Sequence, residues 1–155
     1  TLKTNPDDRR MLCVAWNNAD IDSMALPPCH VMFQFYTKKL ENGKRELSCM
    51  WSQRSVDCGL GWPFNLLSYS ILTYIIAEIC DMEVGDVVCS LGDCHIYLNQ
   101  MEGITEQLTR DPYKYDLPKL VFTRKLTDID DLNFEDIQIE NYQSYPKIAL
   151  PLSVG

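Results

Sequence analysis

The chain alternates short apolar runs with turn residues, a pattern that predicts a mixed α+β fold. Residues 29–40 alternate in part and are rich in Val, Phe and Tyr, which predicts a β-strand. The Asn-Gly step at residues 42–43 predicts a hairpin turn, with residues 46–53 forming the returning strand. Because a hairpin brings the far ends of its two strands together, we expect Cys29 to lie beside Arg54.

One long apolar segment, residues 63–80, predicts a dominant central helix. It contains Asn65 and Glu78, so it is too polar for a membrane span, and it is apolar on more than one face, which predicts burial on most sides. A shorter helix is expected at residues 100–110. Further strands are expected at residues 11–16 (buried), 86–99, 120–125, 137–142 and 148–152. The whole pattern predicts a single domain over residues 1–155: α+β, with a large mixed, mostly antiparallel sheet packed against the central helix.

Composition narrows the class of protein. The chain has 155 residues, of which 46% are hydrophobic, and its net charge of −8 disfavours general binding to nucleic acid. A bound phosphate would therefore depend on a few local arginines. Seven cysteines without a Cys-x-x-Cys pair predict neither a disulfide framework nor a metal site, and indicate a reduced, cytoplasmic setting. The chain begins without Met, so we expect it to be part of a longer protein.

The segment Pro27-Pro28-Cys29-His30 carries the first candidate chemistry. Two prolines fix two backbone φ angles, so the cysteine is held in one geometry, as a covalent nucleophile requires. The alternative is that Cys29 is a small hydrophobic core residue. In a regular strand His30 points to the opposite face from Cys29, which disfavours a simple Cys-His dyad.

Four motifs, in order and at matching spacing, resemble the thymidylate synthase family: Arg9-Arg10, then Leu26-Pro27-Pro28-Cys29-His30, then residues 53–65 with Gln53-Arg54-Ser55 and Pro63-Phe64-Asn65, then Gly92-Asp93-x-His95-x-Tyr97-x-Asn99. The resemblance covers essentially the whole chain and corresponds to the C-terminal portion of the family's enzyme, with the N-terminal portion absent. It implies reductive methylation of dUMP to dTMP with methylenetetrahydrofolate as cosubstrate. It also implies a homodimer whose sheet faces pair.

The resemblance implies catalytic roles for Cys29, Asn65, Arg54 and Asp57. The Cys29 thiolate would add to the uracil ring, and a positive charge at Arg54 would stabilise that thiolate. Arg54 and Ser55 would hold the substrate phosphate, since a guanidinium fork suits a phosphate dianion. In the homodimer, Arg9 and Arg10 would reach the phosphate site of the other subunit.

The resemblance also divides the remaining site residues between nucleotide and folate. Asn65 would bind the uracil edge, since an amide both donates and accepts hydrogen bonds. His95 and Tyr97, expected on one strand face, would bind the sugar hydroxyl, and Gln53 would support the substrate site. The residues implied for folate binding are Asp57, Leu60, Gly61 and Phe64.

Several positions depart from the family pattern, and they keep an alternative open. Ser52 precedes Gln-Arg-Ser with Trp51 before it, Trp62 precedes Pro-Phe-Asn, Cys58 replaces a bulkier residue, Gln100 replaces a common His, and the tail at residues 150–155 is unusual. Changed water access could favour a dUMP hydroxymethylase, in which water instead of hydride captures the methylene intermediate. A silent RNA-binding protein is disfavoured by the acidic charge, whereas a purely structural dimerisation fragment stays possible.

Overall fold

The Asn-Gly turn forms as predicted. It joins β2 (His30–Lys39) to β3 (Arg45–Asp57) in an antiparallel hairpin, and Gly43 adopts the left-handed φ of 84° that the turn requires. The computed structural model, which describes residues 1–153, pairs His30 with Gln53 at the far end of this hairpin. The expected neighbourhood of residues 29 and 54 is therefore confirmed.

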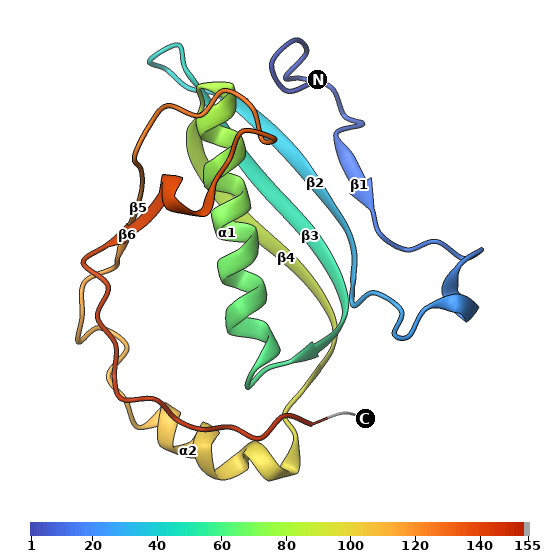
Figure 1. Cartoon of the computed structure of the whole chain (residues 1–155), viewed down its shortest axis with the longest axis vertical. Helices are drawn as coiled ribbons and strands as arrows, with labels where there is room; N and C mark the ends of the chain where they lie inside the picture. The colour runs from blue at the N-terminus through green and yellow to red at the C-terminus, as the bar shows by residue number, and fades with distance from the viewer. Residues whose placement is uncertain (154–155) are drawn as a thin grey trace.

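The main sheet has four strands in the order β1-β2-β3-β4 (Figure 1). The short strand β1 (Leu12–Val14) pairs antiparallel with β2, and β4 (Glu83–His95) pairs parallel with β3. The helix α1 (Gly61–Cys80) connects the two parallel strands. The predicted α+β class with a mixed, mostly antiparallel sheet is confirmed, although β4 starts and ends earlier than the predicted strand at residues 86–99.

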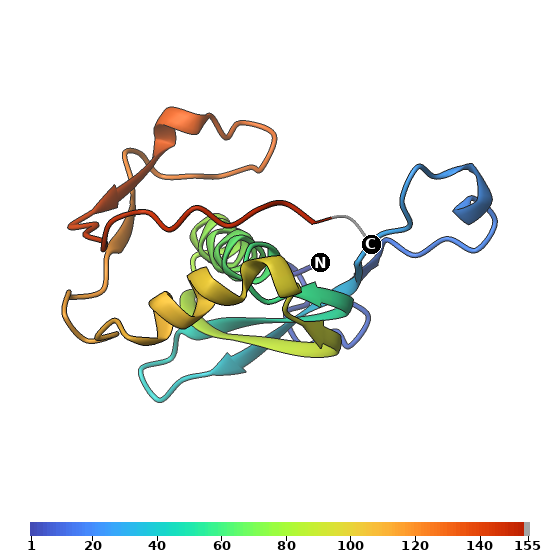
Figure 2. The same ribbon diagram turned by 90° about the horizontal axis from the view of Figure 1, so that it is seen from below.

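Helix α1 lies along one face of the sheet (Figure 2), where Tyr69 packs against Cys49 and Trp51 of β3. Its length and apolar composition would also suit a membrane span, a weak criterion that core helices of soluble proteins meet as well. The prediction that the helix is buried on most sides is wrong within residues 1–153. Phe64 is 67% exposed and Leu67 48% exposed, because only the side facing the sheet is covered.

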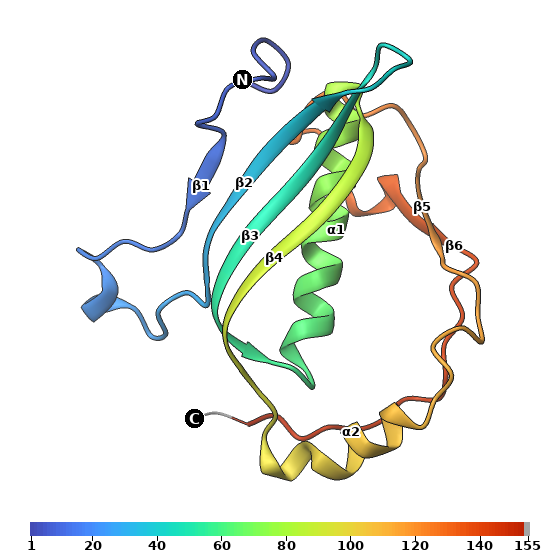
Figure 3. The same ribbon diagram turned by 180° about the vertical axis from the view of Figure 1, so that it is seen from behind.

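The opposite face of the sheet carries no helix in the described part of the chain (Figure 3). Alternation along the strands places Tyr36, Met50 and Val88 on this face, and all three side chains are exposed. Met50 pairs directly with Val88 across β3 and β4. The sheet therefore presents an apolar surface on the side away from α1.

The C-terminal half adds a smaller unit. Helix α2 (Met101–Leu108) follows a 3-10 turn, and β5 (Lys119–Phe122) pairs antiparallel with β6 (Ile137–Glu140). Two predictions about strands are wrong. Residues 148–152 form no strand, because Ile148 and Leu150 pack instead over Gly103 of α2, where no side chain intervenes. Strand β1 is exposed instead of buried, because it is the edge strand. The 3-10 turn before α2 is Leu98–Gln100, and the described residues also form 3-10 turns at Ile21–Ser23 and Phe134–Asp136.

Candidate active site

Cys29 and Arg54 meet at the end of the hairpin. The backbone N–H of Arg54 donates to the carbonyl of Cys29 at 2.9 Å. The Arg54 side chain donates from Nη2 to the carbonyl of Pro27 at 2.8 Å and from Nε to that of Pro28 at 3.1 Å. Cys29 itself is a free, half-exposed thiol. The Pro-Pro pair thus fixes the cysteine backbone and also anchors the arginine.

The guanidinium of Arg54 keeps one donor group free. Its carbon lies 5.7 Å from the ring centroid of Trp16, a cation–π contact that no sequence motif indicated. Nε and Nη2 are occupied by the proline carbonyls, so Nη1 is the nitrogen that has no protein acceptor among residues 1–153. An exposed arginine held in this way can bind an anion without first becoming ordered.

Gln53 links β3 to the start of α1. Its Nε2 donates to Oδ1 of Asn65 at 3.0 Å and to the carbonyl of Ser55 at 2.9 Å, and its Oε1 accepts from the indole of Trp51 at 3.2 Å. Only 3% of Gln53 is exposed, whereas Asn65 is half-buried. The buried amide of Gln53 therefore holds Asn65, and Asn65 is the member of the pair that a ligand can reach.

Asp57 lies beside Asn65 at the N-terminus of α1. One carboxylate oxygen of Asp57 accepts from the backbone N–H groups of Gly59 and Leu60, at 2.9 and 3.2 Å, which leaves the other oxygen available. A Cβ at Gly61 would lie 3.5 Å from Cβ of Asp57 and 3.7 Å from Oδ1 of Asn65, so these residues adjoin. Phe64, which directly precedes Asn65 in the helix, is largely exposed.

The end of β4 brings His95 to the same region. His95 pairs with Asp57 across the parallel strands, and Ser55 pairs with Asp93. The ring of Tyr97 lies edge-on to that of His95, with centroids 5.0 Å apart. Tyr97 lies beyond the end of β4, so its direction is not determined by the strand alternation that the sequence predicted. The side chains of His95 and Tyr97 nevertheless lie together.

His30 faces α1. Its Nδ1 lies 3.1 Å from the hydroxyl of Tyr69, and the two rings stack with centroids 5.4 Å apart. Burial raises the pKa of Tyr69, so its hydroxyl stays protonated and can donate to the imidazole. His30 thus supports the packing of α1 on β2 through Tyr69.

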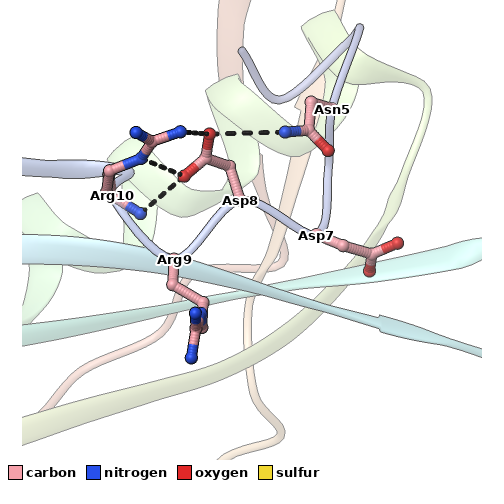
Figure 4. Close-up of a pocket in the computed structure, with 5 residues that line it drawn as sticks. All are labelled: Asn5, Asp7, Asp8, Arg9 and Arg10. Atoms are coloured by element: carbon pink, nitrogen blue, oxygen red, sulfur yellow. Dashed lines mark hydrogen bonds and ion pairs between the residues drawn. The ribbon is translucent and has the colours of Figure 1, made fainter.

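Arg9 and Arg10 lie in the N-terminal segment along the edge of β2, where the Arg9 carbonyl accepts from Gln34 at 3.4 Å. Figure 4 shows the guanidinium of Arg10 on Asp8, bonded at 3.1 Å, and Arg9 pointing away from that pair. The Arg10 guanidinium lowers the pKa of Asp8. Gln34 is five residues along β2 from Cys29, or roughly 17 Å. Neither arginine joins the cluster around Cys29 within one chain.

The C-terminal tail lies along α2. Nε2 of Gln100 donates to the carbonyl of Pro151 at 3.1 Å, and the hydroxyl of Ser153 bonds Oδ1 of Asn99 at 2.9 Å. Gln100 is fully buried. Val154 and Gly155, the last residues of the tail that departs from the family pattern, lie outside the described residues.

Comparison with known proteins identifies the family. The family model described as thymidylate synthase matches residues 1–154. Proteins named thymidylate synthase from Herpesvirus ateles, Saccharomyces cerevisiae and Homo sapiens are 51%, 49% and 50% identical to this chain over 99% of its length. Those alignments cover 51%, 51% and 47% of the relatives, so the chain spans about half of their length. On this match, and on the cluster of motif residues around Cys29, Arg54 and Asn65, the chain belongs to the thymidylate synthase family.

Proposed function

We propose that the protein carrying this chain is a thymidylate synthase, which converts dUMP to dTMP with methylenetetrahydrofolate. The observation that carries the proposal is the juxtaposition of Cys29 with Arg54, whose side chain is bonded to the two carbonyls that precede the cysteine. A thiol and an anion-binding guanidinium at one place suit a nucleophile that acts on a phosphorylated substrate.

In this mechanism the phosphate of dUMP binds Nη1 of Arg54 and the hydroxyl of Ser55. The Cys29 thiolate adds to ring carbon six of the uracil, which makes carbon five nucleophilic toward the methylene of the folate. Loss of the proton on carbon five and cleavage of the methylene–nitrogen bond then release tetrahydrofolate and leave an exocyclic methylene on the ring. Hydride transfer from tetrahydrofolate to that methylene, with expulsion of the Cys29 thiolate, gives dTMP and dihydrofolate. Asn65 binds the uracil edge through its amide.

We assign the remaining residues by their position. His95 and Tyr97, which lie together, bind the sugar hydroxyl. The free oxygen of Asp57 binds the pterin, and Leu60, Gly61 and Phe64 line the folate side. Gln53 acts through Asn65, since its own amide is buried and bonded at both ends.

We further propose that the active protein is a homodimer. The sheet face that bears Tyr36, Met50 and Val88 is exposed in the single chain, and apolar side chains on three neighbouring strands suit a self-complementary interface. Arg9 and Arg10 do not approach Cys29 of their own chain. Their predicted contact with the phosphate site would therefore come from the second subunit.

The cytoplasmic location stays a prediction from cysteine usage. The assignment of residues 1–155 to a single domain, the C-terminal catalytic portion of the enzyme, stays a prediction from the family resemblance. All seven cysteines are free thiols, which agrees with a reducing compartment. The hydroxymethylase alternative finds no support, because the matched relatives are named thymidylate synthase.

The test uses the whole protein that carries this chain, incubated with dUMP and methylenetetrahydrofolate. We expect dihydrofolate and dTMP in equal amounts, and a loss of roughly a thousandfold or more in Cys29→Ser. Cys13→Ser, which changes an exposed thiol in β1, serves as the matched control and keeps full activity. Release of tetrahydrofolate with a hydroxymethylated nucleotide would instead identify the hydroxymethylase. An active Cys29→Ser variant would refute the assigned nucleophile.

A further inference from the structure

The orientation of the Asn65 amide decides which base it can bind. An amide side chain presents an acceptor oxygen at one end and a donor NH₂ at the other. If Nδ2 faces position four of a pyrimidine, a carbonyl there is accepted and an amino group is rejected, and the opposite orientation reverses this choice. The inference that follows rests on the proposed function, in which Asn65 binds the base.

Gln53, the neighbour of Asn65, can adopt only one amide orientation. Its Oε1 faces the indole N–H of Trp51 at 3.2 Å, a group that only donates. Its Nε2 faces the carbonyl of Ser55 at 2.9 Å, a group that only accepts. Turning the amide over would oppose donor to donor and acceptor to acceptor. Gln53 is 97% buried, so water could not compensate for that loss.

The Trp51 ring is itself fixed. It is fully buried between two aromatic residues of α1, stacked on Tyr69 with centroids 4.4 Å apart and on Trp62 with centroids 5.8 Å apart. Trp62, Asn65 and Tyr69 follow one another at spacings of three and four residues, so one face of α1 presents all three to β3. The direction of the Trp51 N–H therefore follows from the packing of the helix on the sheet.

We propose that Trp51 is a positioning residue for base recognition. By fixing Gln53, it makes Nε2 of Gln53 the donor to Asn65, at 3.0 Å, so Asn65 must accept with Oδ1. This leaves Nδ2 of Asn65 as a free donor, matched to the carbonyl at position four of uracil and mismatched to the amino group of cytosine. Trp51 thus favours dUMP over dCMP without touching either nucleotide.

The decisive variant is Trp51→Phe, which keeps an aromatic ring between Tyr69 and Trp62 but removes the N–H. The matched control is Trp62→Phe, which makes the same change of ring in the same stack without removing a bond to Gln53. The dissociation constants of dUMP and dCMP are measured by calorimetry on the whole protein, together with the thermal midpoint of each variant. We expect the preference for dUMP to fall about tenfold in Trp51→Phe, the value of one neutral hydrogen bond, and to stay unchanged in Trp62→Phe.

An unchanged preference in folded Trp51→Phe would overturn the inference, because the lost N–H would then have no effect on the choice of base. An equal loss of preference in Trp62→Phe would also overturn it, because the effect would then come from ring packing alone. If Trp51→Phe does not fold, Gln53→Glu provides the second test. A carboxylate only accepts, so Asn65 must then donate from Nδ2 and present Oδ1, which shifts the preference toward dCMP. A folded Gln53→Glu variant with the original preference would also overturn the inference. Wild-type protein that binds neither nucleotide would overturn the proposed function, and the inference with it.

Discussion

Gly92 of β4 lies against the backbone of Arg54. Its replacement by alanine should therefore displace the Arg54 backbone and disturb the candidate active site. The register pairs Gln53 with Leu91 and Ser55 with Asp93, so Gly92 is opposite Arg54 in the parallel ladder. A Cβ at position 92 would lie 2.6 Å from the Arg54 carbonyl oxygen, against 3.4 Å for ordinary contact. The obstacle is backbone, so the strands must separate locally by about 0.8 Å.

The displacement reaches Cys29, the proposed nucleophile, through one hydrogen bond, since the Arg54 N–H donates to the Cys29 carbonyl. Overpacking of this kind costs about 1–3 kcal/mol of stability. A misplacement approaching 1 Å lowers a catalytic rate by up to about a hundredfold. In Gly92→Ala we therefore expect a lower thermal midpoint together with a loss of about ten- to a hundredfold in kcat/KM for dUMP.

Gly85→Ala provides the matched control on the same strand. A Cβ at Gly85 would also be crowded, at 2.5 Å from the Ser48 hydroxyl and 3.0 Å from the Leu47 carbonyl, but at the end of β3 remote from Arg54. Thermal unfolding and steady-state kinetics on the whole protein separate the two effects. If Gly85→Ala lowers kcat/KM as much as Gly92→Ala at equal loss of stability, the link from Gly92 to Cys29 is refuted.

Four further results are expected. Asn65→Asp should shift binding from dUMP toward dCMP, measured by calorimetry, because a carboxylate cannot donate to the uracil carbonyl; an unchanged preference would argue against its contact with the base. Burial raises the pKa of the Cys49 thiol to about 11, so iodoacetamide at pH 8 should modify Cys29 and spare Cys49, as peptide mass mapping would show. The same shift predicts a contribution to stability that is complete below pH 9 and lost as pH rises toward 11, a loss that Cys49→Ala should remove from the alkaline unfolding profile. The Arg124 guanidinium, bonded at 2.8 and 2.9 Å, lowers the pKa of Asp136. The contribution of Asp136 to the free energy of unfolding should be present above pH 3.8, the ordinary carboxyl pKa, and lost as pH falls through the lower pKa of the folded state. An acid unfolding profile that is unchanged in Asp136→Asn would contradict this.

The hairpin and its consequences were predictable because they depend on local chemistry. The Asn-Gly step fixes the turn, and the turn fixes which residues of β2 and β3 are opposite each other. That register brings Cys29 to the end of β3, and a one-residue shift between His30 and Met32 places it opposite Arg54 instead of Ser55. The bonds of Arg54 to two proline carbonyls could not be foreseen, since they depend on how a loop outside the strands returns to the sheet.

Other features depend on tertiary contacts that leave little trace in the sequence. Residues 148–152 have the composition of a strand, yet they lie on α2, because Gly103 leaves room for Leu150 and Ile148. The apolar faces of α1 predicted deeper burial than one chain provides. Trp51 and Trp62 could be noticed as unusual for the family. Their stacking also depends on Tyr69, which lies about two helical turns after Trp62 and stacks on the other side of the Trp51 ring.

The two connections around β3 differ in the order in which they can form during folding. The β2–β3 hairpin closes a short loop, and hairpins of this kind form within roughly 1–10 μs. The parallel β3–β4 pair requires α1 to fold and cross over first, which makes it a non-local and slower step. The backbone contact between Cys29 and Arg54 belongs to the first step, whereas the His95 contact with Asp57 belongs to the second. During synthesis, Cys29 and Arg54 should therefore meet before His95 reaches the candidate site.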